Sequence, residues 1–195
     1  MIKQVLENGK RFFSKQETSI FSAAATIALA MAGSALLGIW RDRLLYAKFF
    51  VINPGQLDVY NASFKLPDTL FQLLISGALS AAFIPIFSKW IDKDKKKANE
   101  IASIMLNWLL VVFIGLGLFI YLLARPLSQL ITSDFSFDQI SLMTTLVRLL
   151  LAAQLFLLIS NFLTGILHSH QRFILPALAP IIYNLGIIAG ILFLS

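Results

Sequence analysis

Five long apolar runs decide what this chain can fold into. They contain at most one charged residue each and cover residues 18–40, 66–88, 101–124, 140–167 and 173–195. A helix needs about 20 mainly apolar residues to cross the roughly 30 Å hydrocarbon core of a membrane. The chain as a whole is 58% hydrophobic and only 13% charged, which is more apolar than a soluble globular domain. The sequence therefore predicts an integral membrane protein.

The fold class follows from what a backbone needs in lipid. Every peptide N–H and C=O group there requires a hydrogen-bond partner, and the runs lack the alternation of polar and apolar residues typical of a membrane β-barrel. We predict an all-α, polytopic transmembrane helix bundle over residues 18–195, preceded by a cytoplasmic segment over residues 1–17. The bundle should have about five helices, at about 18–47, 62–88, 101–124, 139–167 and 173–195. A signal peptide is the alternative for the first run, but its cleaved apolar core is usually only about 7 to 15 residues long.

Charge at the membrane borders predicts the orientation. Basic residues precede the first run, and a lysine-rich cluster at residues 89–97 separates the second run from the third. The positive-inside rule puts both clusters in the cytoplasm, so we expect the N-terminus inside and Ser133 outside. The net charge of +6 could suggest nucleic acid, yet the cations lack interleaved aromatic residues. Topology and anionic lipid explain them better.

The sequence has few of the residues that a catalytic or metal site needs. The chain has no cysteine, and its two histidines, His168 and His170, stand in a short loop without a nearby carboxylate. We interpret them as solvated loop residues instead of metal ligands. Two acids near membrane depth, Asp42 and Asp68, belong to different helices and have no histidine beside them. An enzyme is therefore not expected, and we predict no catalytic residue, no metal and no cofactor.

Arg41, at the end of the first run, is the strongest candidate for binding a ligand. At about 100° per residue it shares a helix face with small residues, although Ile27 and Leu37 interrupt that face. The small residues are Ala23, Ala30, Ser34 and Gly38. Such a face admits a second helix or leaves room for a ligand, and a guanidinium binds phosphate oxygens in bidentate geometry. Snorkelling and a helix-end pair with Asp42 are the alternatives, while Arg43 lies on the opposite face and should snorkel.

The second run has the composition of a helix that packs closely and breaks easily. Pro67, Gly77 and Pro85 punctuate it, with small residues between the last two. Broken helices are tolerated in membranes where neighbouring helices or a water-filled cavity satisfy the backbone, as transporters often arrange. Asp68 in this run and Arg148 in the fourth indicate that both helices face protein or water somewhere.

Three stretches taken together resemble a known family. In chain order they read "GIWRDRLL", "LDVYNASFKLPDTLFQLLISGALSAAFIPIFS" and "GILHSHQRFILPALAPIIYN". This order resembles the MurJ/MviN family of bacterial lipid II flippases, within the larger superfamily that includes the MATE-type exporters. The resemblance implies a MATE-like N-terminal lobe in the bacterial cytoplasmic (inner) membrane. The family's transporters have fourteen helices, so we also expect these 195 residues to be the N-terminal part of a longer flippase.

The resemblance assigns expected roles to single residues. Arg41 and Asp42 match the family's Arg-Asp pair at a central cavity, where the arginine would bind the diphosphate of the lipid. Further expected substrate-binding residues are Ser34, Gly38, Asp58, Lys65 and Arg148. Residues with an expected structural role are Pro67, Gly77, Pro85, Gly165, Arg172, Pro176, Pro180 and Asn184.

Some positions depart from the family pattern. Ala35 stands where the family usually has an arginine, Phe71 and Gln72 replace a basic pair, and Ser76 replaces a glutamate. The cavity should therefore be less cationic than is usual in the family. This difference leaves room for an altered substrate or coupling ion.

The function that the resemblance implies is transport without chemistry. We expect the chain to move undecaprenyl-diphosphate-linked muropeptide across the inner membrane by alternating access, with an ion gradient or the membrane potential as the energy source. The expected partners are lipid II or a similar polyprenyl-diphosphate lipid, the missing C-terminal transmembrane helices and cell-wall synthesis proteins. The alternatives are a flippase or exporter of a polysaccharide precursor or drug on the same fold, and a non-transporting assembly subunit.

Overall fold

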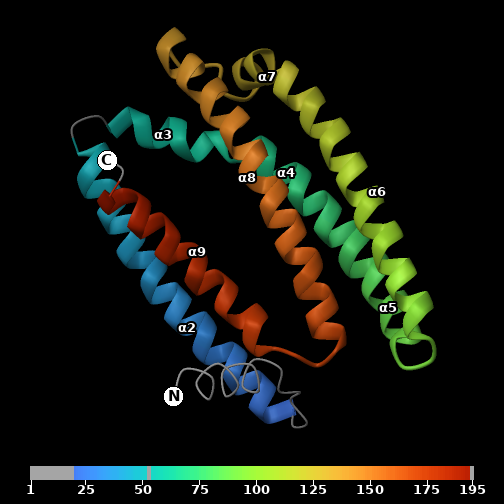
Figure 1. Ribbon diagram of the computed structural model, residues 1–195. Helices are drawn as coiled ribbons and strands as arrows, with labels where there is room; N and C mark the ends of the chain where they lie inside the picture. The colour runs from blue at the N-terminus through green and yellow to red at the C-terminus, as the bar shows by residue number, and fades with distance from the viewer. Residues whose placement is uncertain (1–19, 52–53, 194–195) are drawn as a thin grey trace. The chain divides into compact units, whose positions relative to one another are not determined.

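Helices make up all the regular structure in residues 20–51 and 54–193, which are the residues that the structure describes (Figure 1). The structure is a computed structural model. Five helical stretches are long and apolar enough to cross a membrane: Ala24–Phe49, Gly55–Ile91, Lys95–Leu122, Phe137–Ser169 and Ile174–Phe193. The prediction of an all-α chain with about five membrane-spanning helices is confirmed. The expected cytoplasmic segment, residues 1–17, lies outside the described residues.

The chain divides into two units, one made of residues 1–49 and 166–195 and the other of residues 50–165. In the first unit, α2 (Ile20–Leu45) packs along α9 (Ile174–Phe193). Two glycines of α2 face α9. A Cβ atom added to Gly33 would lie 3.9 Å from Ile181 Cδ1, and one added to Gly38 would lie 3.9 Å from Asn184 Nδ2. Gly33 and Gly38 therefore let the two backbones approach each other closely.

The helices α2 and α9 run in the same direction. Residue 33 contacts residue 181 and residue 38 contacts residue 184, so residue numbers increase in the same direction along both helices. The same pairing continues into η1 (Tyr46–Phe50), a π-helical turn that follows α2. There Lys48 Nζ donates a hydrogen bond to the backbone oxygen of Ile191 at 3.0 Å. A cation at the C-terminal end of α9 is favourable because the helix end leaves carbonyl groups without intrahelical partners.

The second unit begins with an irregular helical path. It consists of α3 (Pro54–Ser63), α4 (Lys65–Leu73), the π-helix η2 (Leu74–Phe83) and α5 (Ile84–Ile91). The helical structure thus starts earlier than the expected bound at residue 62. Pro67 and Pro85 lie in the first turns of α4 and α5, where a missing N–H costs little. The irregularity therefore falls between the prolines, in the wider turns of η2 around Gly77.

Three more helices complete the second unit: α6 (Lys95–Leu122), α7 (Ala124–Ile131) and α8 (Phe137–Ser169), whose last four residues belong to the first unit. Asp94 caps α6, because its Oδ1 accepts hydrogen bonds from the backbone nitrogens of Lys96 and Lys97 at 3.0 and 3.1 Å. The core includes an aromatic cluster in which Phe83 stacks on Phe87 and packs against Phe162 of α8.

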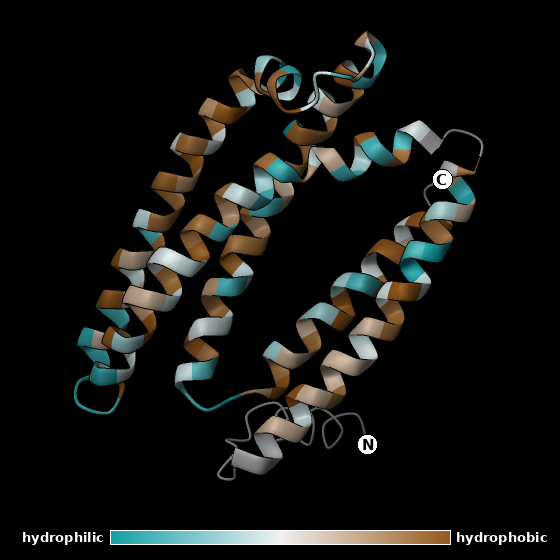
Figure 2. Cartoon of the chain, turned by 180° about the vertical axis from the view of Figure 1, so that it is seen from behind, coloured by the Kyte–Doolittle hydropathy of each residue, from teal (hydrophilic) through white to brown (hydrophobic). Residues whose placement is uncertain are grey.

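Exposed apolar side chains indicate which surfaces meet lipid. On α6, Trp108, Val111 and Phe119 are 64%, 61% and 59% exposed. Figure 2 shows hydrophobic colour along most of the helices, with hydrophilic residues gathered at the turn between α5 and α6. Large exposed apolar areas of this kind are rare on soluble monomers, so they fit a chain whose helices are surrounded by hydrocarbon.

Candidate functional site

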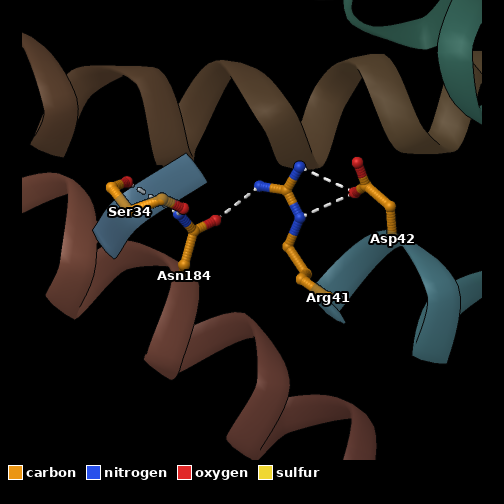
Figure 3. A network of polar contacts seen from close by, with 4 residues as sticks. All are labelled: Ser34, Arg41, Asp42 and Asn184. Carbon is orange, nitrogen blue, oxygen red and sulfur yellow. Dashed lines mark hydrogen bonds and ion pairs between the residues drawn. The ribbon is translucent and has the colours of Figure 1, made fainter. Parts of the chain in front are cut away.

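Arg41 is the centre of a polar network in the first unit. Its Nε and Nη2 atoms contact Asp42 Oδ1 at 2.9 and 2.7 Å, and its Nη1 donates a hydrogen bond to Asn184 Oδ1 at 2.8 Å. Asn184 Nδ2 in turn donates to the backbone oxygen and the Oγ of Ser34, at 3.1 and 3.0 Å. Figure 3 shows the guanidinium held between the two partners. The arginine is therefore fixed in one orientation by groups from both helices.

The guanidinium keeps donors for a further ligand. Arginine has five N–H groups in a planar fork, and the contacts with Asp42 and Asn184 use one on each of its three nitrogens. One N–H therefore remains on Nη1 and one on Nη2. Two such donors side by side are the arrangement that binds two oxygens of a phosphate or carboxylate. The Arg41 side chain is 26% exposed, so part of it is open to a ligand.

The small-residue face of α2 is in contact with α9. Asn184 is 6% exposed and lies against Ser34 and Gly38. Ser34 and Gly38 therefore form part of a helix–helix contact, and the more exposed part of the network consists of Arg41 and Asp42. Asn184 was expected to have a structural role, and its bond to Arg41 could not be predicted from the sequence. The only local signal was an amide within an apolar run.

Arg43 has a different environment from Arg41. Its side chain is exposed, whereas Arg41 is held by two partners. The helix wheel placed the two arginines on opposite faces of α2, and the structure agrees with that placement. The alternative of a helix-end pair between Arg41 and Asp42 is also present in the structure, since the two side chains form an ion pair. Pairing with Asp42 and availability to a ligand are thus compatible.

Three of the expected substrate-binding residues belong to the second unit. Asp58 on α3 and Lys65 at the start of α4 are both exposed. Arg148 on α8 donates a hydrogen bond from Nε to the backbone oxygen of Tyr121 at 3.3 Å, and its Cζ lies 4.9 Å from the centre of the Tyr121 ring. Arg148 is therefore engaged with α6, a contact that the sequence alone did not indicate.

The expected structural residues have diverse surroundings. A Cβ atom on Gly165 would lie 3.7 Å from side-chain atoms of Leu79 and Ile84, so this glycine allows close packing in the second unit. Pro176 is buried in the first turn of α9, while Pro180 lies inside that helix and is exposed. Arg172 Nε is buried without a hydrogen-bond partner.

The two histidines lie at the end of α8 and in the turn that follows it. His168 belongs to the last turn of α8, and its ring packs against Phe173 with 5.3 Å between ring centres. His170 Nδ1 lies 2.9 Å from the backbone oxygen of Ile166. His168 is exposed and His170 is half-buried, so His168 is solvated as expected but belongs to the helix end and not to the loop. Within the described part of the chain, no three His, Cys, Asp or Glu side chains gather as a metal site would require.

Comparison with known proteins gives the chain a family. A family model described as lipid II flippase MurJ matches residues 53–195, a range that includes Asn184 and begins after Arg41. A protein of Thermosipho africanus named lipid II flippase MurJ is 28% identical over 172 residues, which are 88% of this chain and 35% of the relative. A probable lipid II flippase MurJ of Bdellovibrio bacteriovorus is 31% identical over 175 residues, which are 87% of this chain and 33% of the relative.

A third relative shows the same coverage. The probable lipid II flippase MurJ of Rhizobium tropici is 28% identical over 183 residues, which are 90% of this chain and 33% of the relative. The chain thus spans about a third of the length of the curated relatives that it matches. No solved structure matches it at a significant level. Because the family model matches well over half of the residues, the chain belongs to the family described as lipid II flippase MurJ.

Proposed function

We propose that this chain takes part in moving lipid II, an undecaprenyl-diphosphate-linked muropeptide, from the inner to the outer leaflet of the bacterial cytoplasmic membrane. The observation that carries the proposal is the guanidinium of Arg41, which keeps one N–H on each terminal nitrogen for a ligand. It lies in a helix long and apolar enough to cross a membrane. The names of the relatives supply the substrate class.

Arg41 would bind the diphosphate through two parallel hydrogen bonds. Hydrogen bonds between charged groups are shorter and stronger than neutral ones, and the fork is already oriented by Asp42 and Asn184. Asp42 also offsets the positive charge of Arg41, so that the ligand is held without being trapped. No covalent bond is made or broken in this step. The proposed role is therefore transport and not enzymatic catalysis.

The network supplies fewer donors than a diphosphate needs. Such a group carries about two negative charges, and bringing it to membrane depth requires several compensating partners. Arg41 offers one charge, and Asp42 already compensates part of it. We expect the remaining donors to come from further transmembrane helices, because transporters of this kind form their site where two bundles meet and move against each other.

The proposal includes a location and an energy source. The N-terminus and the lysine cluster at residues 89–97 would be cytoplasmic. An ion gradient or the membrane potential would drive the movement, and no bound cofactor is required. Cell-wall synthesis proteins, which consume the lipid in the outer leaflet, would be functional partners.

A second cargo is favoured by one sequence observation. Phe71 and Gln72 stand where the resembling family has a basic pair, and Ala35 replaces another arginine. A less cationic chain suits a polyprenyl-linked polysaccharide precursor with fewer phosphate contacts, or an organic cation. The fold would be the same, and only the headgroup would differ.

Binding to the purified chain in lipid nanodiscs separates these cargoes. The probes are labelled lipid II, undecaprenol without the diphosphate, and a cationic dye. We expect lipid II to bind and the alcohol to bind much more weakly, because Arg41 recognises the phosphate oxygens. Equal binding of the two lipids, or preferential binding of the dye, would contradict the proposed function.

Reconstitution tests the need for further helices. We expect the 195-residue chain in liposomes to bind labelled lipid II without flipping it, and to flip it when the C-terminal helices of a family member are co-reconstituted. A liposome that contains only those C-terminal helices is the control. Fast flipping by the 195-residue chain alone would overturn the requirement and point to a homodimer.

A further inference from the structure

A buried acid–amide pair in the second unit has no part in the Arg41 network. Asp68 lies in the first turn of α4 and is half-buried, whereas Gln154 lies about midway along α8 and is 5% exposed. Gln154 Nε2 donates a hydrogen bond to Asp68 Oδ1. Both residues belong to helices that are long and apolar enough to cross a membrane. The pair therefore joins the second and fourth spans through polar groups.

The contact leaves one polar atom unsatisfied. Gln154 Oε1 is buried and has no hydrogen-bond partner. Leaving a buried acceptor unpaired costs roughly 1–3 kcal/mol, and each such atom in a native structure calls for a physical explanation. Because the same amide group already contacts Asp68, the Asp68 carboxyl group is the nearest candidate for the missing donor.

No basic side chain supplies that donor. Within residues 20–51 and 54–193, no Lys, Arg or His nitrogen lies within 4.0 Å of the Asp68 carboxylate. An ionised carboxylate only accepts hydrogen bonds, so it cannot donate to Gln154 Oε1. A charge without a counter-ion is also expensive in a membrane-spanning helix. With Asp68 ionised, Gln154 Oε1 therefore stays unpaired and the charge has no counter-ion.

A single proton on the carboxyl group solves both. A neutral carboxyl group has one O–H donor and keeps an acceptor oxygen. Its O–H can donate to Gln154 Oε1 while Oδ1 still accepts from Gln154 Nε2, so that acid and amide form a closed pair with two antiparallel hydrogen bonds. The charge disappears and the buried oxygen gains its partner.

We propose that Asp68 is a proton-binding site in the membrane-spanning part of this chain, with Gln154 as the residue that positions the proton. On uptake, an O–H bond forms at Asp68 Oδ2 with a proton from water, and on release the same bond breaks and leaves the carboxylate. No electron is transferred. The proton, and not a metal or organic ligand, is the species bound.

The helices around Asp68 carry other ionisable side chains, and none of them forms an ion pair with Asp68 in the described residues. The nearest along the chain on α4 is Lys65, which is exposed, and η2 carries none. On α6, Tyr121 is occupied with Arg148 of α8. The remaining ionisable side chains on α3, α5, α6 and α8 are Asp58, Tyr60, Lys89, Lys95, Lys96, Lys97, Glu100, Asp138 and His168.

Infrared spectroscopy of the purified chain in nanodiscs tests the site directly. A protonated carboxyl group has a C=O stretching band that is separate from the carboxylate bands. We expect this band at neutral pH in the wild-type chain and its loss in Asp68→Asn. The asparagine can form the same two antiparallel hydrogen bonds without a proton, so the variant should fold. The matched control is Asp58→Asn on the exposed side of α3, which should keep the band.

A second variant identifies the partner. In Gln154→Leu the carboxyl group loses both hydrogen bonds, so we expect its band to shift to higher frequency or to be replaced by carboxylate bands. If the Asp68→Asn variant does not accumulate, this change of the band in Gln154→Leu still shows whether the protonated group is Asp68. A wild-type chain without the protonated band, or a band that survives Asp68→Asn, would overturn the proposal. So would a band that appears only when sodium is replaced by choline, because the site would then hold a cation.

The test is independent of the proposed transport function. It needs no lipid II, and the Arg41→Ala variant should retain the band. A chain that fails to bind lipid II can therefore still bind the proton at Asp68, and the reverse also holds.

Discussion

Arg41 and Arg43 carry the same charge on the same helix, yet their surroundings differ. Asp42 and Asn184 hold Arg41, which is only 26% exposed, whereas the Arg43 side chain is exposed. A pre-oriented guanidinium loses less conformational entropy on binding than a solvated one. The residue that is fixed and still has two N–H groups left is the better ligand-binding group.

Replacement of Arg41 by alanine should weaken binding of lipid II by about ten- to a hundredfold. Hydrogen bonds to charged groups contribute roughly 1.5–3 kcal/mol, and about 1.4 kcal/mol corresponds to a factor of ten. Arg41→Lys should recover only part of the loss, because an ammonium group lacks the planar fork. Titration of labelled lipid II into nanodiscs measures each affinity, with Arg43→Ala as the matched control that should change it little. Equal losses in Arg41→Ala and Arg43→Ala would show that the α2–α9 network is ordinary helix packing.

At the scale of elements, the contact of α2 with α9 decides where Arg41 is held. The two helices approach at Gly33 and Gly38, and Asn184 reaches across to Ser34 and Arg41. The close approach explains why an amide of α9 lies within hydrogen-bond distance of a guanidinium of α2. The orientation of Arg41 and the packing of the two helices therefore depend on the same contact.

A larger side chain at Gly38 should separate the two helices. The Cβ atom of Gly38→Ala would lie at an ordinary contact distance of 3.9 Å from Asn184, so alanine should be tolerated. Gly38→Leu should destabilise the chain by about 1–3 kcal/mol through overpacking and weaken lipid II binding as well. Thermal unfolding in detergent provides the measurement.

The control for this prediction is Gly115→Leu on α6. A Cβ atom there meets nothing within 4 Å, so the substitution adds apolar surface toward lipid without a clash. The two glycines thus test the same change in side chain with and without a neighbouring helix. If Gly38→Leu is as stable as Gly115→Leu, the α2–α9 contact is not as close as described.

For the whole molecule, the parallel course of α2 and α9 limits the topology. Two parallel spans must be separated by an odd number of crossings, and three candidate spans lie between them. The positive-inside rule then predicts that the lysine cluster before α6 is cytoplasmic. The first unit alone gives the relative direction of the two helices, and the side of the membrane on which each end lies is a prediction from charge.

Cysteine labelling in intact cells should find position 133 outside and position 95 inside. The chain has no cysteine of its own, so each introduced thiol is the only one that can react. Ser133 and Lys95 are both exposed, and the variants are therefore Ser133→Cys and Lys95→Cys. A membrane-impermeant maleimide should label the first in intact cells and the second only after permeabilisation. Labelling of position 95 from outside intact cells would show that the predicted orientation is wrong.

Hydropathy and helical periodicity are local properties, and they were enough to predict the five spans, the all-α class and the opposite placement of Arg41 and Arg43. They did not reveal that Asn184 binds Arg41 across 143 residues of chain, or that Gln154 meets Asp68 across 86. They also left open whether the small-residue face of α2 meets a ligand or a helix. Such contacts depend on which helices pack together and in which register. An isolated helix contains no information about its partner, because in lipid any apolar face can be covered equally well by hydrocarbon or by a second helix.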